Sequence, residues 1–466
     1  MKKLIAVVII LGMLPGLSVF AHENGIGSNL DFCSDMPAEV LIKADIYEEI
    51  KNGSGYIDTE KYGLTKAELE SLATETAAEK GLSNIADMEC VEKDGIAAGI
   101  SLKYNDSDIE LFESSEMQDE IDNILSGVDD SMNDVEKALA VHDYFELHYC
   151  YDYSYSNYTK EELFIEKTGV CAAYARGYQY ILTNYLRIPC LYIISEDMNH
   201  AWNLIKIDDN WYHVDCTWDD SINGCRHLHF MVSDEAMADS ERKHYNWKSP
   251  NKATDTSYDN YFWKKVNSAI LKVGGYYYYA AQDEYVHKRN PETGEDTGIY
   301  KIDSRWPCYE KAGYFWRGCF AQIAYYDGRI YVSNKSNIVS MDVNGANVRE
   351  LVSQDPSEGY IYGMVLNGNT LTYDISRDYF VFGIESSKNT VLERSPEFTM
   401  PGDVNGDGKV TKKDLLRLVK HFSGYDVAMD MKAADVTGDG KVTQKDLLRL
   451  ARYFSGYNVV LVQSNG

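Results

Sequence analysis

Three side chains between residues 169 and 220 have the types and the order that cysteine-dependent acyl chemistry requires. Cys171 stands just before a helix-like run, His200 follows 29 residues later, and Asp215 follows after a further 15. Attack on an amide or ester needs a thiolate, an imidazole that takes and returns the proton, and an acceptor that orients the imidazole. We therefore interpret Cys171 as nucleophile, His200 as base and acid, and Asp215 as orienter.

The elements around these residues are suited to hold them. A helix N-terminus and a nearby imidazolium both favour a thiolate, and Cys171 enters a predicted helix. The runs AWNLIKI and NWYHVDCTW alternate like strands around an Asp-Asp-Asn turn, which predicts a hairpin with His200 and Asp215 on adjacent strands. Each residue alone also has a structural interpretation: a buried cysteine, a hydrogen-bonded histidine and a turn aspartate.

The chain has nine cysteines, and an odd number in an exported protein leaves one thiol unpaired, for which Cys171 is the natural candidate. The other eight form disulfides or stay reduced and buried. A disulfide from Cys171 to Cys190 or Cys216 would inactivate the site. No CxxC pair is present, so a structural zinc site is not expected. The trio Cys225, His227 and His229 is interpreted as packing on a strand.

The N-terminus predicts export. Lys2 and Lys3 precede an apolar run over residues 4–14, and small residues end at Ala21, so residues 1–21 read as a secretory signal peptide. The chain is expected to be secreted and extracellular. Its net charge of −28 repels phosphate backbones and anionic lipid surfaces, so neither nucleic acid nor membrane is an expected partner.

The residue patterns along the chain predict a multidomain α+β protein. Residues 22–125 mix helical and strand patterns as a lead-in to a core at 126–262, and residues 263–395 are rich in short strands. Gly275, Gly328 and Gly368 mark turns 53 and 40 residues apart, which suggests propeller-like blades. Three units are too few to close a propeller. We expect a β-rich accessory domain whose tyrosines pack the sheets or contact carbohydrate or peptide.

The tail contains an internal repeat that predicts calcium binding. Residues 402–427 and 434–459 are identical at 19 of 26 positions. Each copy has oxygen-bearing side chains at loop positions 1, 3, 5, 9 and 12 and a glycine at position 6, the pattern of a calcium loop. The alternative, an acidic turn without metal, does not explain two matched copies. Two calcium ions are expected, and the predicted ligands are Asp403, Asn405, Asp407, the Lys409 carbonyl, Thr411, Asp414, Asp435, Thr437, Asp439, the Lys441 carbonyl, Thr443 and Asp446.

Two stretches resemble known families. GVCAAYA, HAWN and WYHVDCTWD resemble the transglutaminase-like fold, which implies a papain-like core and the roles given above for Cys171, His200 and Asp215. That resemblance also implies an oxyanion hole formed by the Cys171 N–H and an upstream side chain, for which Tyr151 and Tyr153 are candidates. Residues 398–460 resemble a type I dockerin, which implies docking to a cohesin module of a scaffoldin in a cellulosome. By the same resemblance, the cohesin-facing residues are Lys412, Lys413, Lys420, Gln444, Lys445 and Arg452.

Together these features predict a secreted, cellulosome-associated cysteine enzyme that acts on amide bonds of a peptide or protein through an acyl-enzyme. It would be a peptidase or a transglutaminase-like acyl transferase. The alternative is a binding or structural component with a decayed triad that recognises protein or plant cell-wall polysaccharide. Peptidoglycan cleavage by a cysteine–histidine peptidase is a third hypothesis, although the histidine of such enzymes usually lies farther downstream than 29 residues.

Overall fold

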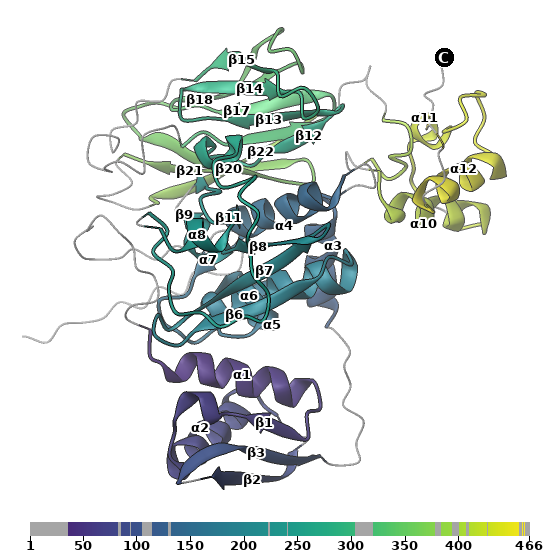
Figure 1. Cartoon of the computed structure of the whole chain (residues 1–466). Coiled ribbons are helices and arrows are strands. Elements are labelled where there is room, and N and C mark those ends of the chain that lie inside the picture. Colours follow the sequence, from purple (N-terminus) through teal and green to yellow (C-terminus); the bar gives the residue numbers. More distant parts are fainter. Residues whose placement is uncertain are drawn as a thin grey trace, which may run out of the picture.

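We analysed a computed structural model of the protein. The residues that it describes are 36–82, 85–93, 95–104, 114–128, 132–221, 224–239, 241–302, 320–377, 384–393, 400–406, 410–425, 427–455, 459 and 461. The predicted signal peptide lies outside this set. Helices and antiparallel sheets follow one another in several units, so the multidomain α+β class is confirmed (Figure 1). Within the described residues, no helix has the length and apolar character needed to cross a membrane.

The N-terminal unit packs two helices on a three-stranded antiparallel sheet of order β1-β3-β2. Thr65 and Glu68 form a capping box that starts the second helix. The first helix buries apolar residues on two sides, one toward this sheet and the other toward the central unit. The elements are α1 (Glu39–Lys51), β1 (Tyr56–Asp58), η1 (Glu60–Tyr62), α2 (Lys66–Glu79), β2 (Ile85–Lys93) and β3 (Ile96–Tyr104).

The central unit is built on a four-stranded antiparallel sheet of order β11-β8-β7-β6, and one helix, α6, packs against β7. The predicted hairpin is confirmed, because β7 and β8 pair with Ile207 opposite Asn210. The elements are α3 (Ser115–Leu125), α4 (Asp134–His148), β4 (Cys150–Tyr151), α5 (Lys160–Glu166), β5 (Thr168–Gly169), α6 (Cys171–Tyr180), η2 (Ile181–Tyr185), β6 (Cys190–Ser195), β7 (His200–Ile207), β8 (Asn210–Val214), α7 (Cys216–Asp219), β9 (Asp220–Ser221), β10 (Gly224–Cys225), β11 (Phe230–Val232), α8 (Asp234–Met237) and η3 (Phe262–Lys265).

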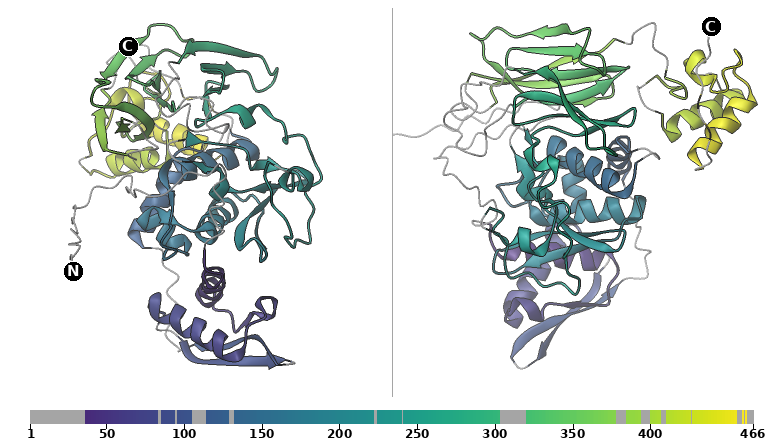
Figure 2. Two further views of the ribbon diagram at one scale, coloured as in Figure 1. Left: turned by 90° about the vertical axis from the view of Figure 1, so that its left-hand side faces the viewer. Right: turned by 45° about the horizontal axis from the view of Figure 1, so that its top comes forward.

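The strand-rich part forms three consecutive antiparallel meanders of four, four and three strands. Gly275, Gly328 and Gly368 have positive φ angles where the first two strands of each meander turn back, as the turn signals predicted. The strands are β12 (Leu271–Val273), β13 (Tyr276–Ala280), β14 (Tyr285–Arg289), β15 (Asp296–Lys301), β16 (Ile323–Tyr326), β17 (Arg329–Ser333), β18 (Asn337–Met341), β19 (Arg349–Ser353), β20 (Tyr360–Asn367), β21 (Thr370–Ser376) and β22 (Ser386–Val391). The meanders share buried clusters, so they form one packed body (Figure 2).

The central unit and the first meander share a hydrophobic core. Phe145, Tyr178 and Phe230 of the central unit belong to the same buried cluster as Tyr277 and Tyr279 of β13. Side-chain bonds cross the same boundary: Tyr277 Oη donates to Glu136 of α4 at 2.6 Å. The first meander therefore packs directly against α4, although the residue pattern of the sequence changes near residue 263.

The tail folds around a small apolar core between two helices that the repeat predicts. Its helices are α10 (Lys412–Phe422), α11 (Met431–Ala434) and α12 (Gln444–Phe454). Val404, Leu418, Val436 and Leu450 are fully buried between them. The tail stands beside the strand-rich part and the central unit (Figures 1 and 2).

Gly169 lies at a tight contact immediately before the helix that begins at Cys171. A Cβ atom there would lie 2.8 Å from Ala173 Cβ, closer than real Cβ contacts, and 3.0 Å from Leu163 Cδ1, tighter than most of them. We expect Gly169→Ala to lower the free energy of unfolding by about 1–3 kcal/mol because the crowded core must shift. Urea unfolding measures this. Gly55→Ala is the matched control, since its Cβ would meet nothing within 4 Å. Equal stability of the two variants would contradict the prediction.

Candidate active site

Cys171 is the first residue of α6, and Val170 precedes it as an N-cap in extended conformation without a side-chain capping bond. The N–H groups of the first helical turn therefore donate no hydrogen bond to a capping side chain. His200 begins β7, opposite Ser195 of β6, and Asp215 comes directly after β8. The helix start and the hairpin bring all three predicted residues together.

His200 is hydrogen-bonded on both sides. Its Nε2 lies 2.6 Å from Asp215 Oδ2, and the side chain is also hydrogen-bonded to Cys171. With Nε2 held by the carboxylate, Nδ1 is the ring nitrogen left for the sulfur. This is the arrangement that an imidazole needs to exchange a proton with a thiol while a carboxylate fixes its orientation.

The Asp215 carboxylate accepts four hydrogen bonds. Oδ1 accepts from the backbone N–H groups of Thr217 and Trp218, at 3.0 and 3.1 Å, and so caps α7. Oδ2 accepts from His200 and from His244, the latter at 2.8 Å. Burial acts to raise the pKa of Asp215, but the two histidines outweigh it and hold the pKa well below the usual range.

His200 and His244 both bond Asp215, but their pKa values shift in opposite directions. Burial acts to lower the pKa of His200, but Asp215 and Cys171 outweigh it and raise the pKa to about 10. Burial dominates at His244 and, together with His229 and His200, lowers its pKa to about 4. His200 therefore carries the proton, whereas burial disfavours the charged form of His244.

His244 is a site residue that sequence reasoning missed. It follows Asp215 by 29 residues, in a segment without a periodic pattern or a motif. Its Nδ1 lies 2.9 Å from the Arg242 carbonyl, and its ring lies 4.4 Å from that of Trp218. No signal in the sequence of that segment could have identified it.

The reactive atoms lie in the interior. Cys171 and His200 each have 0% exposure. Cys171 packs in one cluster with Met36, Val40 and Leu41 at the start of the described chain. The Met36 carbonyl accepts a hydrogen bond from Asn199 Nδ2 at 2.5 Å. The start of the described chain therefore packs in the same buried cluster as Cys171.

The two candidate oxyanion side chains differ in their surroundings. Tyr151 is buried, and its hydroxyl is directed at Met36 Sδ at 3.7 Å. Tyr153 is 46% exposed. A third tyrosine, Tyr192 on β6, is half-buried, and its buried hydroxyl has no hydrogen-bond partner among the described residues. Sequence reasoning did not single it out.

The other cysteines of the site are reduced. None of the six cysteines within the described residues forms a disulfide, so neither Cys190 nor Cys216 is bonded to Cys171. The trio Cys225, His227 and His229 does not converge on one point: His227 bonds Asp143 at 2.8 Å and His229 bonds Asp219 at 3.0 Å. Packing and hydrogen bonding account for these two histidines.

The two loops of the tail bury acidic residues at matching positions. Asp403 and Asp414 of the first loop and Asp435 and Asp446 of the second are at most 2% exposed. Backbone N–H groups bond these carboxylates: Asn405 N to Asp414 at 2.8 Å, and its counterpart Thr437 N to Asp446 at 3.0 Å. Such an all-oxygen donor set fits calcium.

The remaining predicted ligands are less uniform. Asp407 and Lys409 lie outside the described residues. Thr411 and Thr443 cap α10 and α12, which gives their hydroxyls a structural role as well. Asp439 is exposed, with Oδ1 accepting from the Lys441 N–H at 3.0 Å.

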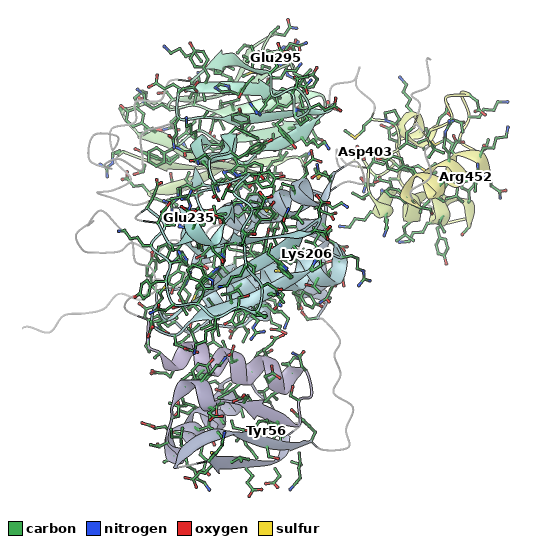
Figure 3. All side chains as sticks on the ribbon, in the orientation of Figure 1. Tyr56, Lys206, Glu235, Glu295, Asp403 and Arg452 are labelled. Atoms are coloured by element: carbon green, nitrogen blue, oxygen red, sulfur yellow. The ribbon has the colours of Figure 1, made fainter. Side chains whose placement is uncertain are left out.

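The residues predicted to face a cohesin lie exposed on the two helices. They are Lys412, Lys413 and Lys420 on α10, and Gln444, Lys445 and Arg452 on α12. Leu416 and Leu448, which occupy equivalent positions in the two repeats, are each 52% exposed beside them. Figure 3 shows Asp403 of the first loop and Arg452 of the second helix on the same small module.

Comparison with known proteins identifies two modules. A model described as transglutaminase-like superfamily matches residues 122–216, and a model described as dockerin type I domain matches residues 401–455. The chain therefore carries a transglutaminase-like domain, which contains Cys171 and His200, and a C-terminal type I dockerin. Asp215 falls at the end of the first match.

A solved structure titled "Crystal structure of a TGase" is similar to 31% of this chain at 13% sequence identity, with a TM-score of 0.20. The chain spans about half of that structure, 47% of its length. No curated protein matches the chain.

The raised pKa of His200 predicts how stability depends on pH. Its protonated form stabilises the folded chain fully below the unfolded pKa of about 6.5, and this contribution is lost as the pH rises from there through about 10. We expect His200→Gln to be more destabilising at about pH 6 than at about pH 10, with a difference on the order of 3 kcal/mol. Urea unfolding of both chains at both pH values measures it. A penalty independent of pH would contradict the assignment.

Proposed function

We propose that this protein is an exported cysteine enzyme that cleaves or transfers amide acyl groups, and that the dockerin attaches it to a scaffold. The observation that supports the enzymatic part most is the continuous chain of hydrogen bonds Cys171–His200–Asp215. Burial keeps bulk water from competing for these bonds, which strengthens each of them. The family match over residues 122–216 agrees with cysteine-based chemistry.

In the proposed mechanism the Cys171 thiolate attacks the carbonyl carbon of an amide. His200 then gives its proton to the leaving amine, and the acyl group remains on sulfur as a thioester. Water or a second amine, deprotonated by His200, attacks the thioester and releases the acid or the new amide. Asp215 keeps the imidazole oriented throughout, and the Cys171 backbone N–H at the start of α6 is a proposed oxyanion donor.

Hydrolysis of peptides is the preferred outcome, with acyl transfer to an amine as the close alternative. A second candidate, a binding component with a relic triad, is favoured by one observation: Cys171 has no exposed surface. In that case the β-rich part at 263–395, which we propose to be an accessory domain with propeller-like repeats, would hold protein or polysaccharide.

A single substitution separates the two candidates. We expect Cys171→Ala to abolish turnover on a panel of peptide and glutamine-containing substrates, because no other nucleophile occupies its place in the triad. The loss should be at least about a thousandfold in kcat/KM. Cys90→Ala is the matched control, a buried cysteine of the N-terminal sheet, and should retain activity. Full activity of Cys171→Ala would refute the enzyme proposal, and no activity in the parent chain on any substrate would favour the binding role.

For the dockerin we propose two calcium sites and cohesin binding by either helix. Asp403, Asn405, Asp407, Thr411 and Asp414 with the Lys409 carbonyl would hold the first ion, and Asp435, Thr437, Asp439, Thr443 and Asp446 with the Lys441 carbonyl the second. Bound calcium would neutralise the buried carboxylates and so stabilise the small core. Cellulosome attachment and an extracellular location follow from this assignment.

The near-symmetry of α10 and α12 can be tested by mutating one helix at a time. Lys412, Lys413 and Leu416 changed to alanine should leave affinity for a type I cohesin within about twofold, because the module can rotate and use Gln444, Lys445 and Leu448. The same holds for the reverse set, whereas both sets together should lower affinity at least about a hundredfold. Calorimetry with a cohesin panel measures this, and chelated protein serves as the calcium-free control. Loss of binding from one set alone would exclude the dual mode.

A further inference from the structure

Glu146 of α4 is a buried acidic residue without a hydrogen bond among the described residues. Its side chain has 0% exposure, and neither of its oxygens has a hydrogen-bond partner among the described residues. A buried carboxyl group that is not hydrogen-bonded costs several kcal/mol on the scale of about 2–7. Glu146 therefore calls for an explanation, and the proposed acyl chemistry does not use it.

Three metal-binding groups converge at Glu146. A Glu146 oxygen, a ring nitrogen of His142 and the sulfur of Cys216 all lie within 4.8 Å of one another, and all three residues are buried. His142 precedes Glu146 by one helical turn, and its Nε2 lies 3.9 Å from Glu146 Oε1. The same Nε2 lies 3.2 Å from Asp219 Oδ2, so a fourth possible ligand atom lies beside His142.

The other face of His142 is arranged as metal-bound histidines usually are. Its Nδ1 lies 3.1 Å from Asp143 Oδ1. A carboxylate at Nδ1 holds the ring in the orientation and tautomer that leave Nε2 as the ligand. Three carboxylates, those of Asp143, Glu146 and Asp219, surround this one imidazole.

In two other buried groups of possible ligands, the carboxylate already accepts several hydrogen bonds. In the group His142–Asp143–His227, the Asp143 oxygens accept from both histidines and from the Ile270 N–H. In the group His200–Asp215–His244, Asp215 accepts four hydrogen bonds. Only the Glu146 group, among those found in the described residues, has a ligand without a bond.

We propose that His142, Glu146 and Cys216 form a structural zinc site, with Asp219 as the fourth ligand. The donor set of one nitrogen, one sulfur and two oxygens suits zinc, whereas calcium and magnesium avoid thiolates. Tetrahedral zinc needs ligand atoms about 3–4 Å apart, so the atoms of His142, Glu146 and Cys216 have to close in by about 2 Å at most. This departs from the expectation drawn from the lack of a CxxC pair, because these ligands come from one helix and a distant cysteine.

The proposed zinc site would also fix the position of the Asp215 carboxylate. Cys216 directly follows Asp215 and begins α7, whose N-terminus Asp215 caps. Asp219 ends the same helix. Zinc held by these two residues would therefore tie α7, and with it Asp215, to α4.

The test uses the untagged full chain, produced with zinc and purified in excess calcium so that the dockerin loops stay occupied. We expect about one zinc per chain by elemental analysis. Replacement by cobalt should give the absorption band of a thiolate-to-cobalt bond. Cys216→Ser should lose the band and Glu146→Gln most of the metal. Cys190→Ser, a buried cysteine of the same core, is the matched control and should keep both.

A chain that folds without zinc and takes up no cobalt would overturn the proposal. Metal that survives Cys216→Ser but not Cys225→Ser would overturn it as well, because it would move the site to the neighbouring histidines. Glu146→Leu gives an independent answer in case a variant folds poorly. Without a metal site this change removes an unpartnered carboxylate and raises stability. With a zinc site it removes a ligand and lowers stability.

Discussion

The bonds of the Asp215 carboxylate hold the centre of this molecule together. A buried carboxylate stays ionised only where donors replace the water that it has lost, and four donors surround Asp215. Two are backbone N–H groups at the start of α7 and two are imidazoles. Because one oxygen caps the helix while the other binds His200, the position of α7 and the orientation of the imidazole cannot vary independently.

The same short helix organises the polar interior behind the site. Asp219, at the other end of α7, accepts from the His229 backbone and ring and also faces His142 of α4. The Asp215 backbone N–H in turn donates to the His229 carbonyl at 3.3 Å. Histidines and carboxylates therefore alternate from the thiol into the core, and α4, which they contact, also rests on the first meander. This interior makes the strand-rich part a support for the site rather than an independent appendage.

Patterns local in the sequence predicted the most. Alternation around a turn gave the β7–β8 hairpin with Asp215 directly after it, and a 32-residue repeat indicated the two capped helices of the tail. Contacts between segments without periodicity could not be predicted. His244 reaches Asp215 from an irregular segment, and Glu146 lies on a helix whose apolar stripe conceals that its carboxylate points inward. One hydrophobic core includes residues on both sides of residue 263. The sequence did not predict it, because the composition changes at that point although the packing is continuous.

The residue that precedes the β7–β8 hairpin contacts the segment that packs in the buried cluster of Cys171. The turn between β6 and β7 ends at Asn199, which has a positive φ of 48° and directly precedes His200. That strained residue also donates to the Met36 carbonyl, so the backbone that positions the imidazole holds the N-terminal segment in place too. A substrate carbonyl cannot reach a sulfur with no exposed surface. Met36 belongs to the same buried cluster as Cys171, so the Asn199 bond links the residue next to His200 to the segment packed in that cluster.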